Sequence, residues 1–197
     1  MPAGTVLVLD DVPIRAEEVD EVGSAVAILE PQDSPLELRK LALTLSIFPR
    51  VAARSIDPAA RETARKQAEI YVQALEKGTL PSGPLSGPIE MERTGTFREL
   101  GLDVWRATVG LEPGRWSGIV ESPGCFHVVR VKSRKEASLA TMTSLTIGAF
   151  DFPFVQIETA KADLEAAYDR SRLVIVDPTW RDAVPATWRY RLHVENP

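Results

Sequence analysis

The sequence predicts an α+β protein, in which helices and strands are grouped along the chain instead of alternating strictly. Three observations support this class. A helix with signals at both ends occupies residues 57–78. Two short strands separated by a Ser-Pro-Gly turn lie within residues 110–136, and a strand, a helix and a further strand follow within residues 139–177. Residues 1–56 before them are predicted to be mainly helical.

The first element is predicted in residues 5–30, which indicate a short strand, a turn and a helix. The strand is "TVLVL", and we expect the helix to begin near Pro13. Glu17 and Glu18 would then lie in its first turns, where acidic side chains suit the positive end of the helix dipole.

Residues 34–49 fit two structures. Ser34 as the N-cap and Pro35 at the first helical position favour a helix, which Pro49 would end or kink. The alternative is a strand, because apolar residues alternate through the same segment. The helical stripe is made of Leu38, Leu41, Leu45 and Phe48, and the alternating set of Leu41, Leu43, Leu45 and Ile47.

The helix at 57–78 is the clearest element. Asp57 is its predicted N-cap, Pro58 its first residue and Gly78 its end. The following segment, "TLPSGPLSGP", predicts a loop because it is rich in proline and glycine. A shorter helix is predicted around "LDVWRATVG". The apolar face of the long helix consists of Ala60, Ala64, Ala68, Tyr71 and Leu75.

The last third of the chain predicts a strand in "LATMTSLTIGAFDF", a helix in "VQIETAKADLEAAYDRS" and a buried strand in "RLVIVD". The final segment, "PTWRDAVPATWRYRLHV", is aromatic and basic. Arginine between aromatic residues can form a nucleic-acid surface. A closing strand whose aromatic side chains pack on the preceding helix is the interpretation that the overall charge favours.

Composition excludes several classes of function. A formal net charge of −5 argues against a nucleic-acid partner, which would need a concentrated basic surface. No apolar run approaches the length of a membrane span, and the N-terminus lacks a signal-peptide pattern. A single cysteine excludes an internal disulfide and a cysteine-rich zinc site, and two histidines argue against a multi-histidine metal site. We therefore expect no metal and no cofactor.

Two residues in the stretch 110–136 carry potential chemistry. His127 lies on a predicted strand, where it either forms a catalytic hydrogen bond or simply pairs with its neighbours. Cys125 lies two residues earlier, so both side chains point to the same face. A Cys–His nucleophile pair would need them closer than the regular spacing of a strand allows. Trp105 and Trp116 fit either a peptide-binding wall or the core.

The segment "VWRATVGLEPGRWSGIVESPGCFHVVRVKSR" resembles the C-terminal half of a parvulin-type (PpiC/SurA-like) peptidyl-prolyl isomerase domain. The residues that carry the resemblance are Leu111, Pro113, Gly114, Ser117, Val120, Ser122, Phe126, His127, Val128, Val129 and Val131. One departure is Gly124-Cys125, where the family has a bulky residue and then glycine. Residues 64–78, "ARKQAEIYVQALEKG", are similar to the family's first helix, and residues 5–30 to the start of SurA-type envelope folding factors.

The resemblance implies a site with two histidines on neighbouring strands, a cysteine or acid beside them and an apolar cup. The second histidine corresponds to His127, with Cys125 as its catalytic neighbour. The first would lie on a strand in residues 43–50, where Ser46 stands. Glu90 is the candidate acidic partner. The implied substrate-binding residues are Phe126, Met91, Val104, Trp105 and Ser122.

The expected organisation is an N-terminal SurA-like region (1–56), a degenerate parvulin-like α/β unit (57–136) and a C-terminal strand-helix-strand module (137–197). The implied function is a folding factor that binds extended, Pro-containing polypeptide, with or without isomerase activity. The alternative is a catalytically inactive chaperone or an assembly subunit. The resemblance also suggests a periplasmic or envelope location, whereas the oligomeric state stays open.

Overall fold

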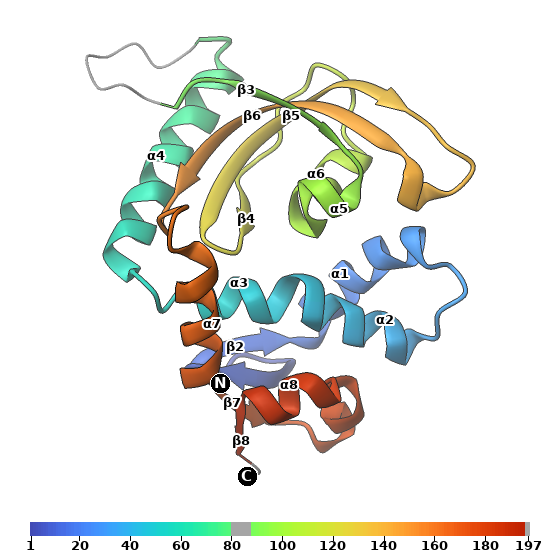
Figure 1. The fold of residues 1–197 in the computed structure, drawn as a ribbon, viewed down its shortest axis with the longest axis vertical. Helices are drawn as coiled ribbons and strands as arrows, with labels where there is room; N and C mark the ends of the chain where they lie inside the picture. Colours follow the sequence, from blue (N-terminus) through green and yellow to red (C-terminus); the bar gives the residue numbers. More distant parts are fainter. Residues whose placement is uncertain (80–87, 196–197) are drawn as a thin grey trace. The chain divides into compact units, whose positions relative to one another are not determined.

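A computed structural model describes residues 1–79 and 88–195 and confirms the α+β class (Figure 1). The chain forms two compact units. The discontinuous unit combines Met1–Ile56 with Ile157–Pro197, and the inserted unit is Asp57–Gln156. Most of the predicted proline-rich loop lies outside the described residues. No helix among the described residues is long and apolar enough to cross a membrane. The predicted division into three domains stays a prediction.

The discontinuous unit contains a four-stranded sheet in the order β2-β1-β7-β8, in which only β7 and β8 are parallel. Its strands are β1 (Thr5–Leu9), β2 (Val12–Arg15), β7 (Arg172–Ile175) and β8 (His193–Glu195). Its helices are α1 (Ala16–Leu29), α2 (Pro35–Ala42), α3 (Phe48–Ala53), α7 (Ala160–Arg170) and α8 (Ala186–Arg191), with a π-helical turn at Leu43–Ile47 and a 3₁₀ turn at Pro178–Ala183.

The first helix begins later than the sequence predicts. Asp10 and Asp11 have positive φ angles of 49° and 64°, which suit a tight hairpin turn between two strands. Residues 12–15 therefore return as β2, and α1 begins at Ala16.

The ambiguous segment 34–49 is helical. The Ser34 hydroxyl accepts a hydrogen bond from the Glu37 backbone N–H at 3.3 Å, as expected of an N-cap. The π-helical turn follows, and Pro49 lies in the first turn of α3. The strand that the resemblance places here is absent, because residues 43–47 form the π-helical turn, in which Ser46 is buried. This correction removes Ser46 as the counterpart of the first histidine.

As far as residue 195, where the description ends, the C-terminal segment is also mainly helical, with a strand at residues 193–195 alone. The prediction of a closing strand is therefore wrong over most of its length. The predicted packing is confirmed for Trp188, whose ring lies 5.1 Å from that of Tyr168 on α7.

The inserted unit contains an antiparallel sheet in the order β3-β6-β5-β4. Asp57 caps α4 by accepting a hydrogen bond from the Ala60 N–H at 2.8 Å, as predicted. The elements are α4 (Pro58–Glu76), β3 (Met91–Gly95), α5 (Phe97–Leu100), α6 (Leu102–Val109), β4 (Val120–Ser122), β5 (Cys125–Lys135), a 3₁₀ turn at Ala140–Met142 and β6 (Ser144–Pro153).

The two faces of this sheet are packed against different helices. On one face, the Tyr71 ring of α4 lies 5.1 Å from the rings of Phe150 and Phe152. On the other face, Arg134 of β5 donates to the Val109 carbonyl oxygen at the end of α6, at 2.6 Å. Figure 1 shows α4 running along the sheet and the short α5 and α6 beneath it. Side chains alternate between these faces, so neighbours in sequence have different surroundings.

Candidate functional site

His127 lies on β5 and faces away from α4. Its cross-strand partners are Val120 on β4 and Asp151 on β6. Directly paired residues point to the same face of a sheet, so the Asp151 carboxylate is brought to the imidazole by register. The turn before β5 needs Gly124, whose φ of +85° is rarely adopted by other residues.

The imidazole is hydrogen-bonded through both nitrogens. Its Nε2 lies 2.7 Å from the Ser122 Oγ, and its Nδ1 lies 2.7 Å from Asp151 Oδ1. A neutral imidazole carries one N–H, and a carboxylate can only accept. The compatible arrangement therefore has Nδ1–H donating to Asp151 and the Ser122 hydroxyl donating to Nε2. The Cys125 Sγ is 3.8 Å from Nδ1, closer than regular strand spacing suggests.

Burial sets the protonation of this cluster. Desolvation, together with the nearby Arg93 cation, lowers the pKa of His127 from 6.5 to about 4. Asp151 is ion-paired with Arg93, so its charge is already balanced. Burial raises the pKa of the Cys125 thiol to about 11. At neutral pH the site thus holds a neutral imidazole and a protonated thiol, and Cys125 lacks the thiolate that nucleophilic attack requires.

The predicted site residues divide between the two faces. Ser122 and Cys125 contact His127, and Met91 lies on the same face, where 55% of it is exposed. Phe126 points to the opposite face, where its ring lies 5.3 Å from that of Phe154.

The two predicted residues of α6 are buried. Val104 is 2% exposed and Trp105 is 1% exposed, and the Trp105 indole N–H has no partner among the described residues. Glu90 does not lie beside His127, because its carboxylate accepts hydrogen bonds from Arg130 and lies 3.3 Å from the Lys132 ammonium. These contacts lower the pKa of Glu90 against the opposing effect of its desolvation.

Sequence reasoning missed Asp151 and Arg93. Asp151 stands between Phe150 and Phe152 in an otherwise apolar strand, which is the signal that could have identified it. Arg93 lies on β3, the neighbour of β6, on the face shared with His127. Asp151 also brings a third kind of metal-ligand atom to this face. The Cys125 sulfur, a His127 ring nitrogen and an Asp151 carboxylate oxygen all lie within 4.8 Å of one another.

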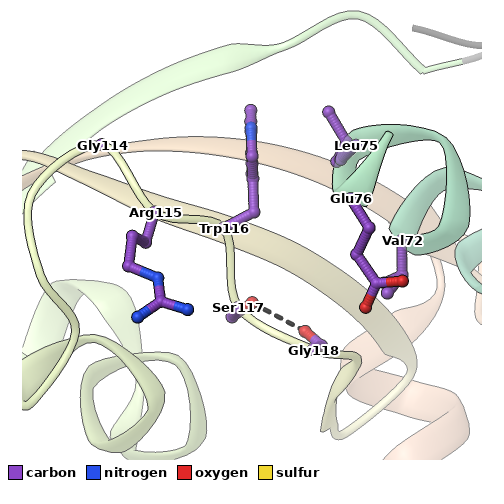
Figure 2. A pocket seen from close by; sticks show the side chains of 8 residues that line it. All are labelled: Val72, Leu75, Glu76, Gly114, Arg115, Trp116, Ser117 and Gly118. Carbon is purple, nitrogen blue, oxygen red and sulfur yellow. Dashed lines mark hydrogen bonds between the residues drawn. The ribbon is translucent and has the colours of Figure 1, made fainter. Parts of the chain in front are cut away.

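A separate pocket of about 410 Å³ opens on the face covered by α4 (Figure 2). Trp116 stacks on Phe150 at 5.1 Å, and Arg130 lies over its ring at 4.7 Å, so the indole is fixed from two sides. This pocket is on the other side of the sheet from His127. Its lining residues are Val72, Leu75 and Glu76 of α4 and the facing segment Gly114, Arg115, Trp116, Ser117 and Gly118.

Comparison with known proteins supports the resemblance in the sequence. A family model for the PPIC-type PPIase domain matches residues 37–143, more than half of the chain. The match includes His127 and ends before β6, so Asp151 lies outside it. Searches of curated proteins and of solved structures gave no significant match. Because this match covers more than half of the chain, the chain belongs to the PPIC-type peptidyl-prolyl isomerase domain family.

Proposed function

We propose that the chain is a folding factor that binds extended, Pro-containing polypeptide at the His127 face of the inserted unit and isomerises X-Pro bonds there. Family membership implies a polypeptide substrate. Uncatalysed X-Pro isomerisation takes tens of seconds and limits the folding of many proteins, so both a catalyst and a holder of unfolded chains would be useful.

The chemistry requires hydrogen bonds rather than a nucleophile. Amide resonance gives the X-Pro bond a rotation barrier of about 18–20 kcal/mol, which a site lowers by binding the twisted amide better than the planar one. A neutral imidazole held at both nitrogens is rigid and uncharged. The protonated Cys125 beside it fits a mechanism without a covalent intermediate.

The observation that carries the proposal is the hydrogen-bonded series Ser122–His127–Asp151. The resemblance implies two histidines on neighbouring strands, of which His127 is the second, and here Asp151 on the neighbouring strand β6 is the polar side chain beside it. Histidine is replaced by a carboxylate that Arg93 neutralises. In this interpretation Asp151 is a positioning residue, which fixes the tautomer of His127 and the orientation of its ring.

Substrate would approach over β3, where this face is exposed at Met91. Met91 is the most exposed predicted contact, and it lies on β3, an outer strand of the sheet. An extended peptide can add backbone hydrogen bonds to an outer strand with little sequence preference. This mode of binding suits a protein that must accept many unfolded chains.

The test is an NMR exchange measurement of cis–trans interconversion in a series of Xaa-Pro peptides. Wild type should accelerate exchange, and His127→Ala should abolish the acceleration. Asp151→Asn should reduce it while leaving peptide affinity within about twofold, because a positioning residue acts on the rate. His193→Ala, which alters the other histidine of the chain, is the matched control and should match wild type. Unchanged acceleration in His127→Ala would refute the assignment.

A second candidate is a chaperone or assembly subunit without isomerase activity. It is favoured by the burial of Val104 and Trp105, whose own side chains occupy the positions expected to line an apolar cup. Such a protein would suppress aggregation of an unfolded client and would accelerate no peptide. This candidate would be selected if wild type accelerates no peptide isomerisation and if the suppression of client aggregation persists in His127→Ala.

A further inference from the structure

We propose that Cys125, His127 and Asp151 form a binding site for a thiophilic divalent cation of the Zn²⁺ class. The inference stands on the geometry of these side chains and does not depend on isomerase activity. The composition argues against cysteine-rich and multi-histidine sites, but a mixed site needs only one side chain of each type.

The ligand atoms are close to the positions that a tetrahedral ion requires. Typical Zn–S, Zn–N and Zn–O bonds imply separations of about 3.4–3.6 Å between ligand atoms. The Cys125 Sγ and His127 Nδ1 are 3.8 Å apart. Asp151 Oδ1 is 2.7 Å from Nδ1, so this pair has to move apart, and all three ligand atoms lie within 4.8 Å of one another. The β5–β6 pairing holds all three Cα atoms in place.

Of the side chains around these three ligands, Ser122 favours metal binding and Arg93 opposes it. A metal-bound histidine usually donates its second N–H to an oxygen, and here Nε2 lies 2.7 Å from the Ser122 Oγ. The Ser122 hydroxyl can in turn donate to the Cys125 carbonyl oxygen at 3.3 Å. Arg93, by contrast, competes for Asp151 and adds a positive charge.

The protons balance in a single exchange. The metal takes Sγ, Nδ1 and Oδ1; the thiol proton leaves to solvent; and the imidazole proton moves from Nδ1 to Nε2, where it is donated to Ser122. Thiolate and imidazole together select zinc-like ions over Mg²⁺ or Ca²⁺, which prefer oxygen ligands. Because Nδ1 would no longer bond to Asp151, metal binding would also switch off any catalysis that uses that hydrogen bond.

The test uses the full chain, stripped with a chelator and titrated with Co²⁺, followed by displacement with Zn²⁺. The expected result is one Co²⁺ per chain, with the intense visible bands of tetrahedral cobalt and a thiolate charge-transfer band. Cys125→Ser should abolish that band and weaken binding at least about tenfold, and Ser122→Ala should weaken binding about 10–100-fold. Arg93→Gln should tighten binding, since it removes the opposing charge.

The matched control is His193→Ala, which should bind Co²⁺ as wild type does. Asp151→Asn, of nearly unchanged shape, should also weaken binding and provides a second variant if Cys125→Ser fails to fold, as judged by circular dichroism. The proposal is overturned if no charge-transfer band forms, if Cys125→Ser or Asp151→Asn binds as tightly as wild type, or if His193→Ala alone removes the signal. These readouts require no enzymatic activity, so they remain interpretable even if no peptide is isomerised.

Discussion

Lowering the pH from 6.5 to 4 should destabilise the folded protein by about 3 kcal/mol through His127 alone. In the folded state the pKa of this imidazole is about 4, because of burial and, secondarily, Arg93. In the unfolded chain it takes the ordinary value of 6.5. Between these values the unfolded state binds one proton more than the native state. The stabilisation is therefore complete above pH 6.5 and is lost progressively as the pH falls towards 4.

The measurement is urea unfolding at pH values between about 7 and about 4, in the presence of a chelator, for wild type, His127→Gln and His193→Gln. Carboxylates also titrate in this range, so the informative quantity is the difference between variants. The free energy of unfolding of His127→Gln should fall less steeply with acidification than that of wild type, by about 3 kcal/mol over the interval. His193→Gln should keep the wild-type slope.

Equal slopes for wild type and His127→Gln would refute the reasoning, because they would mean that the imidazole is protonated equally easily in both states. Direct observation of the histidine ring protons by NMR would then show His127 titrating near neutral pH. In that case Asp151 would hold a charged imidazolium, and both the neutral-imidazole mechanism and its tautomer would have to be abandoned.

Three further predictions concern stability and can be measured by chemical denaturation. Asp151→Asn should lower the free energy of unfolding by about 2–3 kcal/mol, since it breaks a partly buried charged network with Arg93. Glu92→Gln, which removes an exposed ion pair with Lys132 on the same sheet, should lower it by less than about 1 kcal/mol. Equal losses would contradict the assigned network. Gly124→Ala should cost about 1–2 kcal/mol, because φ is +85° and the new Cβ would lie 3.0 Å from the Val155 side chain. An unchanged midpoint would show that the turn relaxes freely. Asp57→Ala should cost about 1 kcal/mol by removing the cap of α4, and a neutral effect would mean that the cap is replaced by water.

Local signals predicted most of the helices correctly. Asp57 and Ser34 both cap helices as expected, because a cap depends on a few adjacent residues. The hairpin at Asp10 and Asp11 was missed, since two aspartates are a weaker sign of positive φ angles than Asn-Gly or Asp-Gly.

The candidate site was only half predictable. Ser122, Cys125 and His127 lie within six residues of one another, and the family pattern marks two of them. Asp151 is 24 residues away from His127 and meets it only through the β5–β6 register. Register depends on the whole sheet and leaves little trace in a local sequence pattern.

The position of β6 has a consequence for synthesis on the ribosome. His127 emerges well before its partner strand, and until β6 has been made, β5 and β3 each have an unpaired edge that can pair with other chains. A fragment ending at residue 143, where the family match stops, would keep these open edges permanently. The discontinuous unit is completed later still, because β7 and β8 are translated after the whole of the inserted unit. The inserted unit can therefore finish folding before the ribosome has made all of the discontinuous unit.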